Sequence, residues 1–234
     1  MGKNVEYSID GAQYVGYLAE PAGSGKAPGV LVCHEGPGLD DHAKWRADRL
    51  AELGHVAFAL DYHGGGKALP LDEVMPKLVA LIQSPDETRK RGRAGLAQLL
   101  AHPRVDASRV ASIGYCFGGT MSLELARDGA ELAAVVGFHS GLGSQKPATP
   151  GSISARVLVC IGADDPMIPV EQRNAFESEM KQAGCDWRLY VYGGAEHSFT
   201  NKNADLMGRP GIKYHAPTDE RSWRAMLDFF AEVF

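Results

Sequence analysis

The chain has 234 residues, of which 44% are hydrophobic and 23% are charged, and these proportions are ordinary for a soluble globular protein. Its 24 basic and 29 acidic residues leave a net charge of -5, which gives no reason to expect nucleic-acid binding. No apolar run approaches the roughly 20 residues that a membrane-spanning helix needs, so we expect no membrane partner.

The four cysteines are Cys33, Cys116, Cys160 and Cys185, and they form neither a C-x-x-C pair nor the spacing of a secreted disulfide framework. Residues 1–6 lack the apolar core of a signal peptide. We therefore expect reduced thiols and a cytoplasmic protein. No set of histidine, cysteine and aspartate has the spacing of metal ligands, so we predict no metal and no cofactor.

In chain order, the sequence first predicts a β-hairpin. Strand patterns at 5–9 and 13–19 flank Asp10-Gly11, a dipeptide that favours a tight turn. Short apolar runs predict further strands at 30–33, 56–60, 109–113, 133–138, 157–161 and 187–192. Helical patterns lie at 41–53, 69–82, 86–101, 119–126, 170–183 and 218–234.

Two of these helices carry more specific expectations. Trp45, Leu50 and Leu53 supply the apolar positions of the first predicted helix. Pro76 is expected to interrupt the second helix early, because proline removes a backbone donor.

Strands that alternate with helices after a hairpin imply an α/β fold, with a mostly parallel central sheet and helices on both faces. No internal repeat, low-complexity tract or domain linker interrupts the pattern. We therefore expect residues 1–234 to form a single α/β domain.

The most informative stretch is 114–118, Gly-Tyr-Cys-Phe-Gly, which lies between a predicted strand and a predicted helix. This G-x-C-x-G turn has the pattern of a nucleophile elbow with sulfur in place of the usual serine oxygen. The glycines allow a sharp turn whose central residue has a sparsely populated backbone conformation. The helix N-terminus favours a thiolate at Cys116. A buried structural cysteine in a tight turn explains the motif equally well when it is taken alone.

Four loops that leave predicted strand ends carry reactive side chains: Glu35, Cys116, Asp165 and His197. In a parallel sheet, ligands bind beyond the carboxyl ends of the strands. The chain order of nucleophile, acid and histidine is that of α/β-hydrolase triads. A cysteine nucleophile needs a base, histidine supplies one near neutral pH, and a carboxylate fixes the tautomer of the histidine.

Each of these residues also has a structural interpretation. His197 could cap a turn, Asp165 could cap the following helix, and Asp164 is an equally acidic neighbour. Glu35 could be a surface residue. The elbow and the chain order together favour the catalytic interpretation.

The chain resembles the dienelactone hydrolase family of α/β-hydrolases from its hairpin to its C-terminal helix. Four motifs carry this resemblance: Cys-His-Glu-Gly at 33–36, Gly-Tyr-Cys-Phe-Gly-Gly at 114–119, Gly-Ala-Asp-Asp-Pro-Met-Ile-Pro at 162–169, and Gly-Ala-Glu-His-Ser-Phe at 194–199. The resemblance implies that Cys116 is the nucleophile, His197 the base and acid, and Asp165 the residue that orients the histidine.

By the same resemblance, Glu35 lies near the thiol and helps to generate the thiolate when substrate binds. The oxyanion hole would consist of the backbone N–H groups of Phe117 and Gly36. The family holds a substrate carboxylate with arginines, one of them four residues after the catalytic histidine, and here that position is Asn201. The residues expected to line the substrate pocket are Tyr115, His63, His139, Phe199 and Asn201.

We therefore expect a cofactor-free hydrolase that acts on small-molecule carboxylic esters or lactones through a covalent thioester, as a monomer or homodimer. One alternative is a promiscuous hydrolase of aryl esters, thioesters or organophosphate triesters. A non-enzymatic alternative is an inactive relative that serves as a binding module, although a complete set of Cys116, Asp165 and His197 argues against it.

Overall fold

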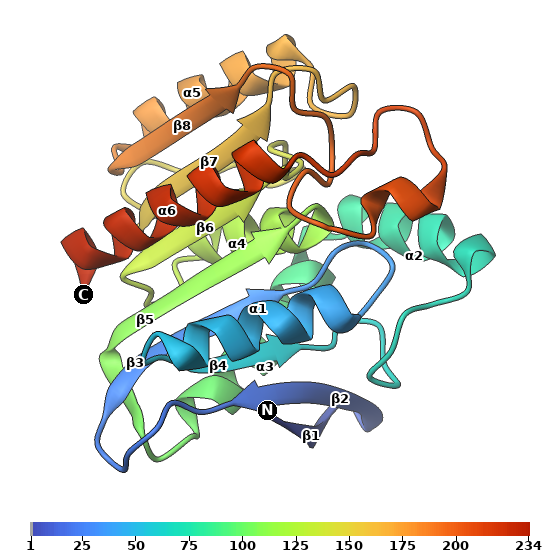
Figure 1. Cartoon of the computed structure of the whole chain (residues 1–234). Coiled ribbons are helices and arrows are strands. Elements are labelled where there is room, and N and C mark those ends of the chain that lie inside the picture. Colours follow the sequence, from blue (N-terminus) through green and yellow to red (C-terminus); the bar gives the residue numbers. More distant parts are fainter. Residues whose placement is uncertain (1) are drawn as a thin grey trace.

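A computed structural model describes residues 2–234. At its centre is one eight-stranded sheet with the strand order β1-β2-β4-β3-β5-β6-β7-β8, seen in Figure 1. The strands are β1 (Lys3–Ile9), β2 (Ala12–Ala19), β3 (Ala27–Cys33), β4 (Val56–Leu60), β5 (Val105–Tyr115), β6 (Ala134–Phe138), β7 (Arg156–Gly162) and β8 (Trp187–Tyr192). β1 pairs antiparallel with β2, and β2 pairs antiparallel with β4, whereas the other neighbours are parallel.

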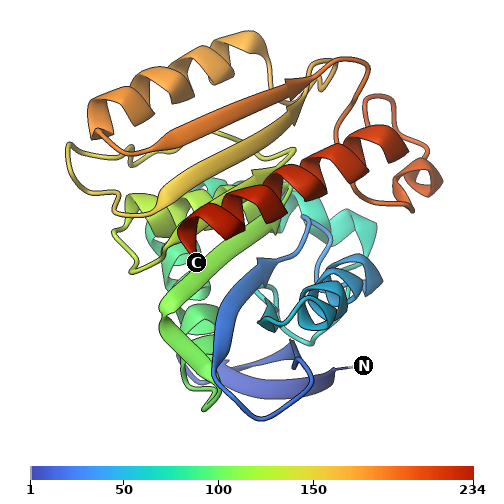
Figure 2. The same ribbon diagram turned by 60° about the vertical axis from the view of Figure 1, so that its left-hand side comes forward.

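Helices cover both faces of this sheet. They are α1 (Asp41–Glu52), α2 (Leu71–Gln83), α3 (Pro85–Leu100), α4 (Phe117–Arg127), α5 (Val170–Ala183) and α6 (Ala216–Val233), with a short 3-10 helix, η1 (Ala204–Met207). α1 and α6 pack on one face, and α2, α3, α4 and α5 contribute to the core on the other (Figures 1 and 2). No helix within residues 2–234 is long and apolar enough to cross a bilayer.

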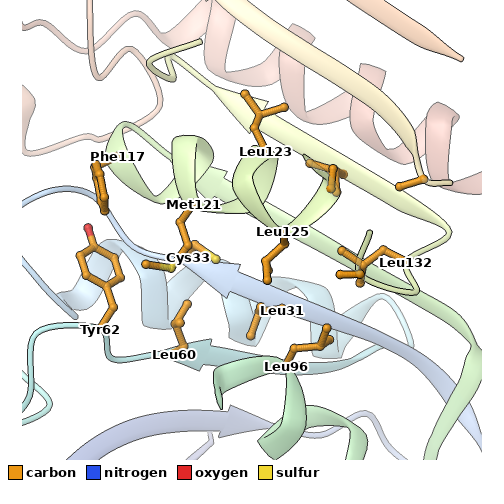
Figure 3. Close-up of a cluster of buried hydrophobic side chains, with 14 of the residues drawn as sticks. Leu31, Cys33, Leu60, Tyr62, Leu96, Phe117, Met121, Leu123, Leu125 and Leu132 are labelled. Atoms are coloured by element: carbon orange, nitrogen blue, oxygen red, sulfur yellow. The ribbon is translucent and has the colours of Figure 1, made fainter. Parts of the chain in front are cut away.

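Figure 3 shows the core beneath α4, the helix that follows the elbow. Met121 and Leu125 of α4 pack with Leu31 and Leu60 of the sheet and with Leu96 of α3. All five side chains are buried. Full burial of such a side chain stabilises the fold by about 1.5–3 kcal/mol, so this cluster fixes α4, and with it the elbow, against the sheet.

The predicted elements are found, and two expectations within them are wrong. Trp45 and Leu53 are 40% and 45% exposed, and of the three predicted apolar positions only Leu50 lies on the buried face of α1. The other buried residues of this helix are His42, Ala43, Arg46 and Ala47. The guanidinium of Arg46 is buried in an ion pair with Asp219. α1 therefore buries Arg46, whereas the Trp45 side chain that the sequence predicts to be buried is exposed. α2 begins at Leu71 and continues through Pro76 to Gln83 rather than being interrupted.

The sheet places the candidate residues at one edge of the molecule. Loops leave the carboxyl ends of β3, β5, β7 and β8 on the side toward which the β5 arrow points in Figure 1. α2 and the segment containing η1 lie at the same end (Figure 1). Residues far apart in the sequence therefore meet above the strand ends, where ligands bind in open α/β sheets.

Candidate active site

The predicted elbow is a sharp turn between β5 and α4. Cys116 has φ 54° and ψ -123°, in the left-handed region that side chains rarely adopt. A Cβ atom at Gly114 would lie 2.1 Å from the carbonyl oxygen of Gly118, and one at Gly118 would lie 2.2 Å from that of Cys33. Only glycine allows this close approach, so the two glycines of the motif hold the sulfur at the N-terminus of α4.

Asp165 and His197 form a buried pair beside the elbow. The Nδ1–H group of His197 donates to Oδ2 of Asp165 at 2.7 Å, and the N–H of Met167 donates to Oδ1 at 2.8 Å. Asp165 is buried, whereas Asp164 is exposed. Asp165, rather than its equally acidic neighbour Asp164, is therefore the residue that bonds the imidazole.

The other ring nitrogen of His197, Nε2, is buried and has no hydrogen-bond partner among the described residues. Burial alone lowers the pKa of His197. The neighbouring Cys116 and Asp165 outweigh that effect and raise the pKa well above its ordinary value. An imidazole that is oriented through Nδ1 and free at Nε2 can take a proton from a thiol and later donate it.

The two N–H groups predicted for the oxyanion hole, those of Phe117 and Gly36, donate to no acceptor among the described residues. Phe117 is the first residue of α4, where backbone donors lack helical partners. The carbonyl oxygen of Glu35 accepts from the hydroxyl of Tyr62 at 2.9 Å and from Nδ1–H of His34 at 2.6 Å. Because the peptide is planar and trans, the N–H of Gly36 points away from this buried carbonyl.

His63 does not line the substrate pocket, contrary to expectation. Its Nε2–H group donates to the carbonyl oxygen of Gly36 at 2.9 Å. The ring therefore supports the peptide units around Gly36. Tyr62 and His34, which the sequence analysis did not single out, hold the preceding peptide.

Glu35 is only 1% exposed, and both of its carboxylate oxygens accept hydrogen bonds. Oε1 accepts from the hydroxyl of Ser198 at 2.7 Å, and Oε2 accepts from the amide of Asn201. Glu35 and Cys116 line the same cavity, as expected of a carboxylate near the thiol, but no hydrogen bond joins them among the described contacts. Burial, reinforced by the Asp40 carboxylate, raises the pKa of Glu35, and the two donors only partly oppose this shift.

His139 lies directly under the elbow and is fully buried. The N–H of Cys116 is shared between the carbonyl oxygen of Phe138 at 3.0 Å and Nδ1 of His139 at 3.1 Å. Because Nδ1 accepts, the proton of the ring is on Nε2, which donates to Oγ1 of Thr200 at 2.8 Å. Burial, together with the neighbouring His197, lowers the pKa of His139 well below its ordinary value. His139 also has a positive φ, 41°. It is a neutral bridge between the backbone of Cys116 and the loop after β8.

Two cavities lie beside the sulfur, and both are lined by Cys116 and His197. The first, which we call the Ser198 cavity, has a volume of about 350 Å³, and the second, the Thr120 cavity, has about 490 Å³. Both share apolar side chains at the mouth, among them Met75 of α2.

None of the five residues predicted to line the pocket borders either cavity. Tyr115 is buried and stacks on Phe138, with ring centroids 4.9 Å apart. Phe199 is buried against His139, and Asn201 is engaged with Glu35.

Several of the apolar side chains that do line the cavities come from α2 and η1. Val74, Met75 and Leu78 of α2, Met167, and Leu206 of η1 provide the apolar lining. One feature of the sequence could have indicated the lining residues of α2. This segment has more apolar residues than a single buried helix face requires. Among residues 2–234, no three histidine, cysteine, aspartate or glutamate side chains are grouped so that they could hold a metal ion.

An elbow after β5, an acid after β7 and a histidine after β8, on a mostly parallel sheet, define the class of protein as an α/β-hydrolase fold. The comparison with protein families is more specific. The sequence model of the dienelactone hydrolase family matches residues 15–234, so the chain belongs to this family. The fold class and the family resemblance inferred from the sequence are both confirmed.

Solved structures and a curated relative agree with this family. The structure of m3DLH is 44% identical, with a TM-score of 0.94, and the match covers 100% of this chain and 98% of that one. A crystal structure of a dienelactone hydrolase-like promiscuous phosphotriesterase from metagenomic libraries is 40% identical, with a TM-score of 0.93 and the same coverage of 100% and 98%.

A protein from Bradyrhizobium, named as a probable 2-oxo-3-(5-oxofuran-2-ylidene)propanoate lactonase, is 30% identical over 206 residues, which are 83% of this chain and 82% of that protein. Membership of the family and these similarities make the protein an enzyme, a dienelactone hydrolase-like hydrolase.

Proposed function

We propose that the protein hydrolyses small-molecule carboxylic esters or lactones through a covalent thioester on Cys116. The observation that carries this proposal is the geometry of His197, which is bound through Nδ1 to Asp165 and is free at Nε2. His197 and Cys116 line the same two cavities, so a substrate in either one meets both side chains.

The first half of the reaction forms the acyl-enzyme. The Cys116 thiolate attacks the carbonyl carbon, and the proton of the thiol passes to Nε2 of His197. The oxyanion of the tetrahedral intermediate accepts hydrogen bonds from the N–H groups of Phe117 and Gly36. The C–O bond then breaks, and His197 donates its proton to the oxygen that departs from the carbonyl carbon. An ester releases its alcohol, whereas a lactone opens to a hydroxyl that stays attached to the acyl group on sulfur.

The second half uses the same groups in reverse. His197 takes a proton from a water molecule, and the resulting hydroxide adds to the thioester carbonyl. The C–S bond breaks, sulfur leaves as the thiolate, and the carboxylic acid product is released. Asp165 remains a carboxylate throughout and stabilises the imidazolium that forms in each half.

The test combines turnover with intact-protein mass spectrometry. We expect hydrolysis of p-nitrophenyl acetate and of a small lactone, and a mass increase of one acyl group at Cys116 when the reaction is quenched early. Cys116→Ala should show neither. Turnover without acylation of Cys116 would contradict the proposed mechanism, and absence of turnover on all esters and lactones would contradict the proposed function.

A second candidate activity is hydrolysis of organophosphate triesters. It is favoured by the similarity to a structure described as a promiscuous phosphotriesterase, at 40% identity over the whole chain. The same thiolate and oxyanion hole can act on a phosphorus centre, with a leaving alkoxide or aryloxide protonated by His197. Release of p-nitrophenol from a diethyl p-nitrophenyl phosphate triester, lost in Cys116→Ala, is the expected result. A single turnover that leaves a stable phosphoryl group on sulfur would exclude catalytic triester hydrolysis.

A further inference from the structure

The two cavities beside Cys116 differ in the structural elements that form them. Two residues beside His197 line the Ser198 cavity. Ser198 follows His197 in sequence, and Ile212 pairs with His197 in an isolated β-bridge. Phe117 and Thr120, from the first turn of α4, line the Thr120 cavity. One cavity is therefore built on the loop of the histidine, and the other on the helix of the nucleophile.

This difference has a consequence for the two halves of an ester. The leaving oxygen must receive its proton from His197, so the alcohol half departs along the side of the histidine. The acyl half stays bonded to Cys116 after the alcohol has left. From the elements that form the cavities, we propose that the Ser198 cavity binds the alcohol half of the substrate and that the Thr120 cavity binds the acyl half. This inference rests on the proposed function.

The lining residues indicate the chemistry of both halves. Apart from His197, the residues that line the Thr120 cavity include no charged side chain. Of those that line the Ser198 cavity, Glu35 and Arg209 are charged, and the carboxylate of Glu35 is already bound by Ser198 and Asn201. Most of the remaining surface is apolar.

The exposed side chains at the entrance of the two cavities also favour an apolar substrate. Met75, Ile82, Met167 and Leu206 are 52%, 50%, 47% and 83% exposed, and each lines at least one of the cavities. Exposed large apolar side chains gathered around a cavity commonly mark a binding site. The substrate class is thus an uncharged ester with an apolar acyl half and an apolar alcohol half, larger on both sides than a small anionic lactone.

Two series of esters separate the two cavities. The first keeps p-nitrophenol as the alcohol and lengthens the acyl chain from acetyl to octanoyl. The second keeps a butanoyl group and lengthens the alcohol from ethyl to octyl, followed by titration of the released acid. In the wild type, kcat/KM should rise with chain length in both series, by up to about fourfold for each newly buried methylene.

Matched variants assign each cavity. Ile82 lines the Thr120 cavity and not the Ser198 cavity, whereas Leu206 lines the Ser198 cavity and not the Thr120 cavity. Ile82→Ser should lower kcat/KM for the longest acyl chains roughly threefold to tenfold and leave the alcohol series unchanged. Leu206→Ser should lower kcat/KM most for the longest alcohols and leave the dependence on acyl length unchanged. Val191→Ser is the control, because Val191 is 47% exposed on β8 and lines neither cavity.

A blocking variant gives an independent measurement. A Cβ atom at Gly143, which lines the Thr120 cavity, would meet no atom within 4 Å. Gly143→Phe should therefore fold, reduce kcat/KM for octanoyl esters by about tenfold or more, and retain activity on acetyl esters. It should also slow hydrolysis of an octanoyl-enzyme that has already lost its alcohol, whereas Leu206→Ser should not.

The outcomes distinguish this inference from the proposed function. Cys116 could be acylated while the two variants show exchanged selectivities or both act on one series. Either result overturns the assignment of the cavities and leaves the thioester mechanism standing. Absence of acylation at Cys116 overturns both. A preference of more than tenfold for a carboxylate-bearing alcohol, lost in Arg209→Gln, would overturn the apolar chemistry assigned to the Ser198 cavity.

Discussion

Two regions of the site are built in opposite ways. The first, which we call the polar base, consists of Glu35, His139, Ser198, Thr200 and Asn201, all buried. The second, the apolar rim, consists of Met75, Ile82, Met167 and Leu206, all largely exposed. Hydrogen bonds join Glu35 to Ser198 and Asn201, and a second set joins His139 to Thr200 and to the backbone of Cys116. The apolar side chains of the rim make no such bonds.

Backbone conformation separates the two regions as well. Four described residues other than glycine have a positive φ. One is Asp10, in the hairpin turn, and the others are Cys116, His139 and Ser198, at the elbow or in the polar base. Such conformations persist only where the surroundings over-determine them. The contrast teaches that the base fixes where the reacting atoms are, and that the rim can change without moving them. We therefore expect the base to control rate and the rim to control substrate preference.

The largest effect should follow from removal of the nucleophile itself. Cys116→Ala should lower turnover on the order of 10⁶-fold, because no other group can form the thioester. The thermal unfolding temperature should change little, since Cys116 is only partly buried. Cys185→Ala is the control, because that thiol lies outside both cavities. A Cys116→Ala enzyme with a tenth of wild-type activity would show that Cys116 is not the nucleophile.

The next largest effect concerns the partner of the histidine. Asp165→Asn should reduce kcat by about 10⁴-fold, because an amide at this position no longer holds the correct tautomer of His197. Asp164→Asn should retain nearly full activity, because Asp164 is exposed. Steady-state kinetics on one p-nitrophenyl ester measures both variants. Equal losses in the two variants would mean that negative charge near His197, rather than the hydrogen bond to Nδ1, supports catalysis.

The position of each candidate catalytic residue could be predicted from the sequence, because each one follows a recognisable strand. Cys116, Asp165, His197 and Glu35 all lie in loops at the carboxyl ends of strands, and a parallel sheet brings such loops together. This reasoning needs only the order of elements. It does not depend on which way any side chain points.

The pocket could not be predicted in this way. Tyr115 and Phe199 are close to catalytic candidates in sequence, yet both are buried in the core on the face covered by α1 and α6. Successive residues at a strand end or in a turn point in different directions, so sequence proximity is a poor guide to a shared cavity. Met75 precedes Cys116 by some 40 residues, and only the packing of α2 over the strand ends brings them together.

His139 tests whether the polar base acts by positioning. His139→Leu removes one of the two acceptors of the Cys116 N–H group, leaving the carbonyl oxygen of Phe138, and it removes the donor to Thr200. A displaced nucleophile can lose about 10²-fold in rate, so kcat should fall by that order with little change in KM. His139→Asn, which keeps a polar side chain and tolerates a positive φ, should recover part of the loss. A change confined to KM would instead place His139 in substrate binding.

Glu35 should give a smaller effect on rate and a characteristic effect on stability. Because Asn201 and Ser198 can still bond a glutamine at this position, Glu35→Gln should lower activity without abolishing it, since His197 remains as the base. It should also shift the pH dependence of the rate at which iodoacetamide alkylates Cys116. Superimposable alkylation curves for the wild type and Glu35→Gln would remove Glu35 from the mechanism.

The stability effect follows from the sign of the pKa shift. The folded-state pKa of Glu35 is raised by burial, so the folded state binds this proton more tightly than the unfolded chain does. The corresponding stability is fully present below the ordinary pKa of glutamate and is lost as the pH rises through the raised value. The unfolding temperature of Glu35→Gln relative to the wild type should therefore increase from acid to neutral pH. Glu6→Gln, at an exposed position on β1, should show no such trend.

The smallest effect is expected at the apolar rim, and it is the sharpest test of the contrast between the two regions. Leu206→Ser changes a side chain that is 83% exposed, and surface substitutions of this kind usually alter the free energy of unfolding by no more than about 0.5 kcal/mol. Iodoacetamide is too small to need the rim, so its rate of reaction with Cys116 should match the wild type at every pH. Turnover of an acetyl ester should also remain within about twofold. If Leu206→Ser instead slowed alkylation or shifted its pH dependence, the rim would be coupled to the thiol, and the division between a base that controls rate and a rim that controls substrate preference would fail.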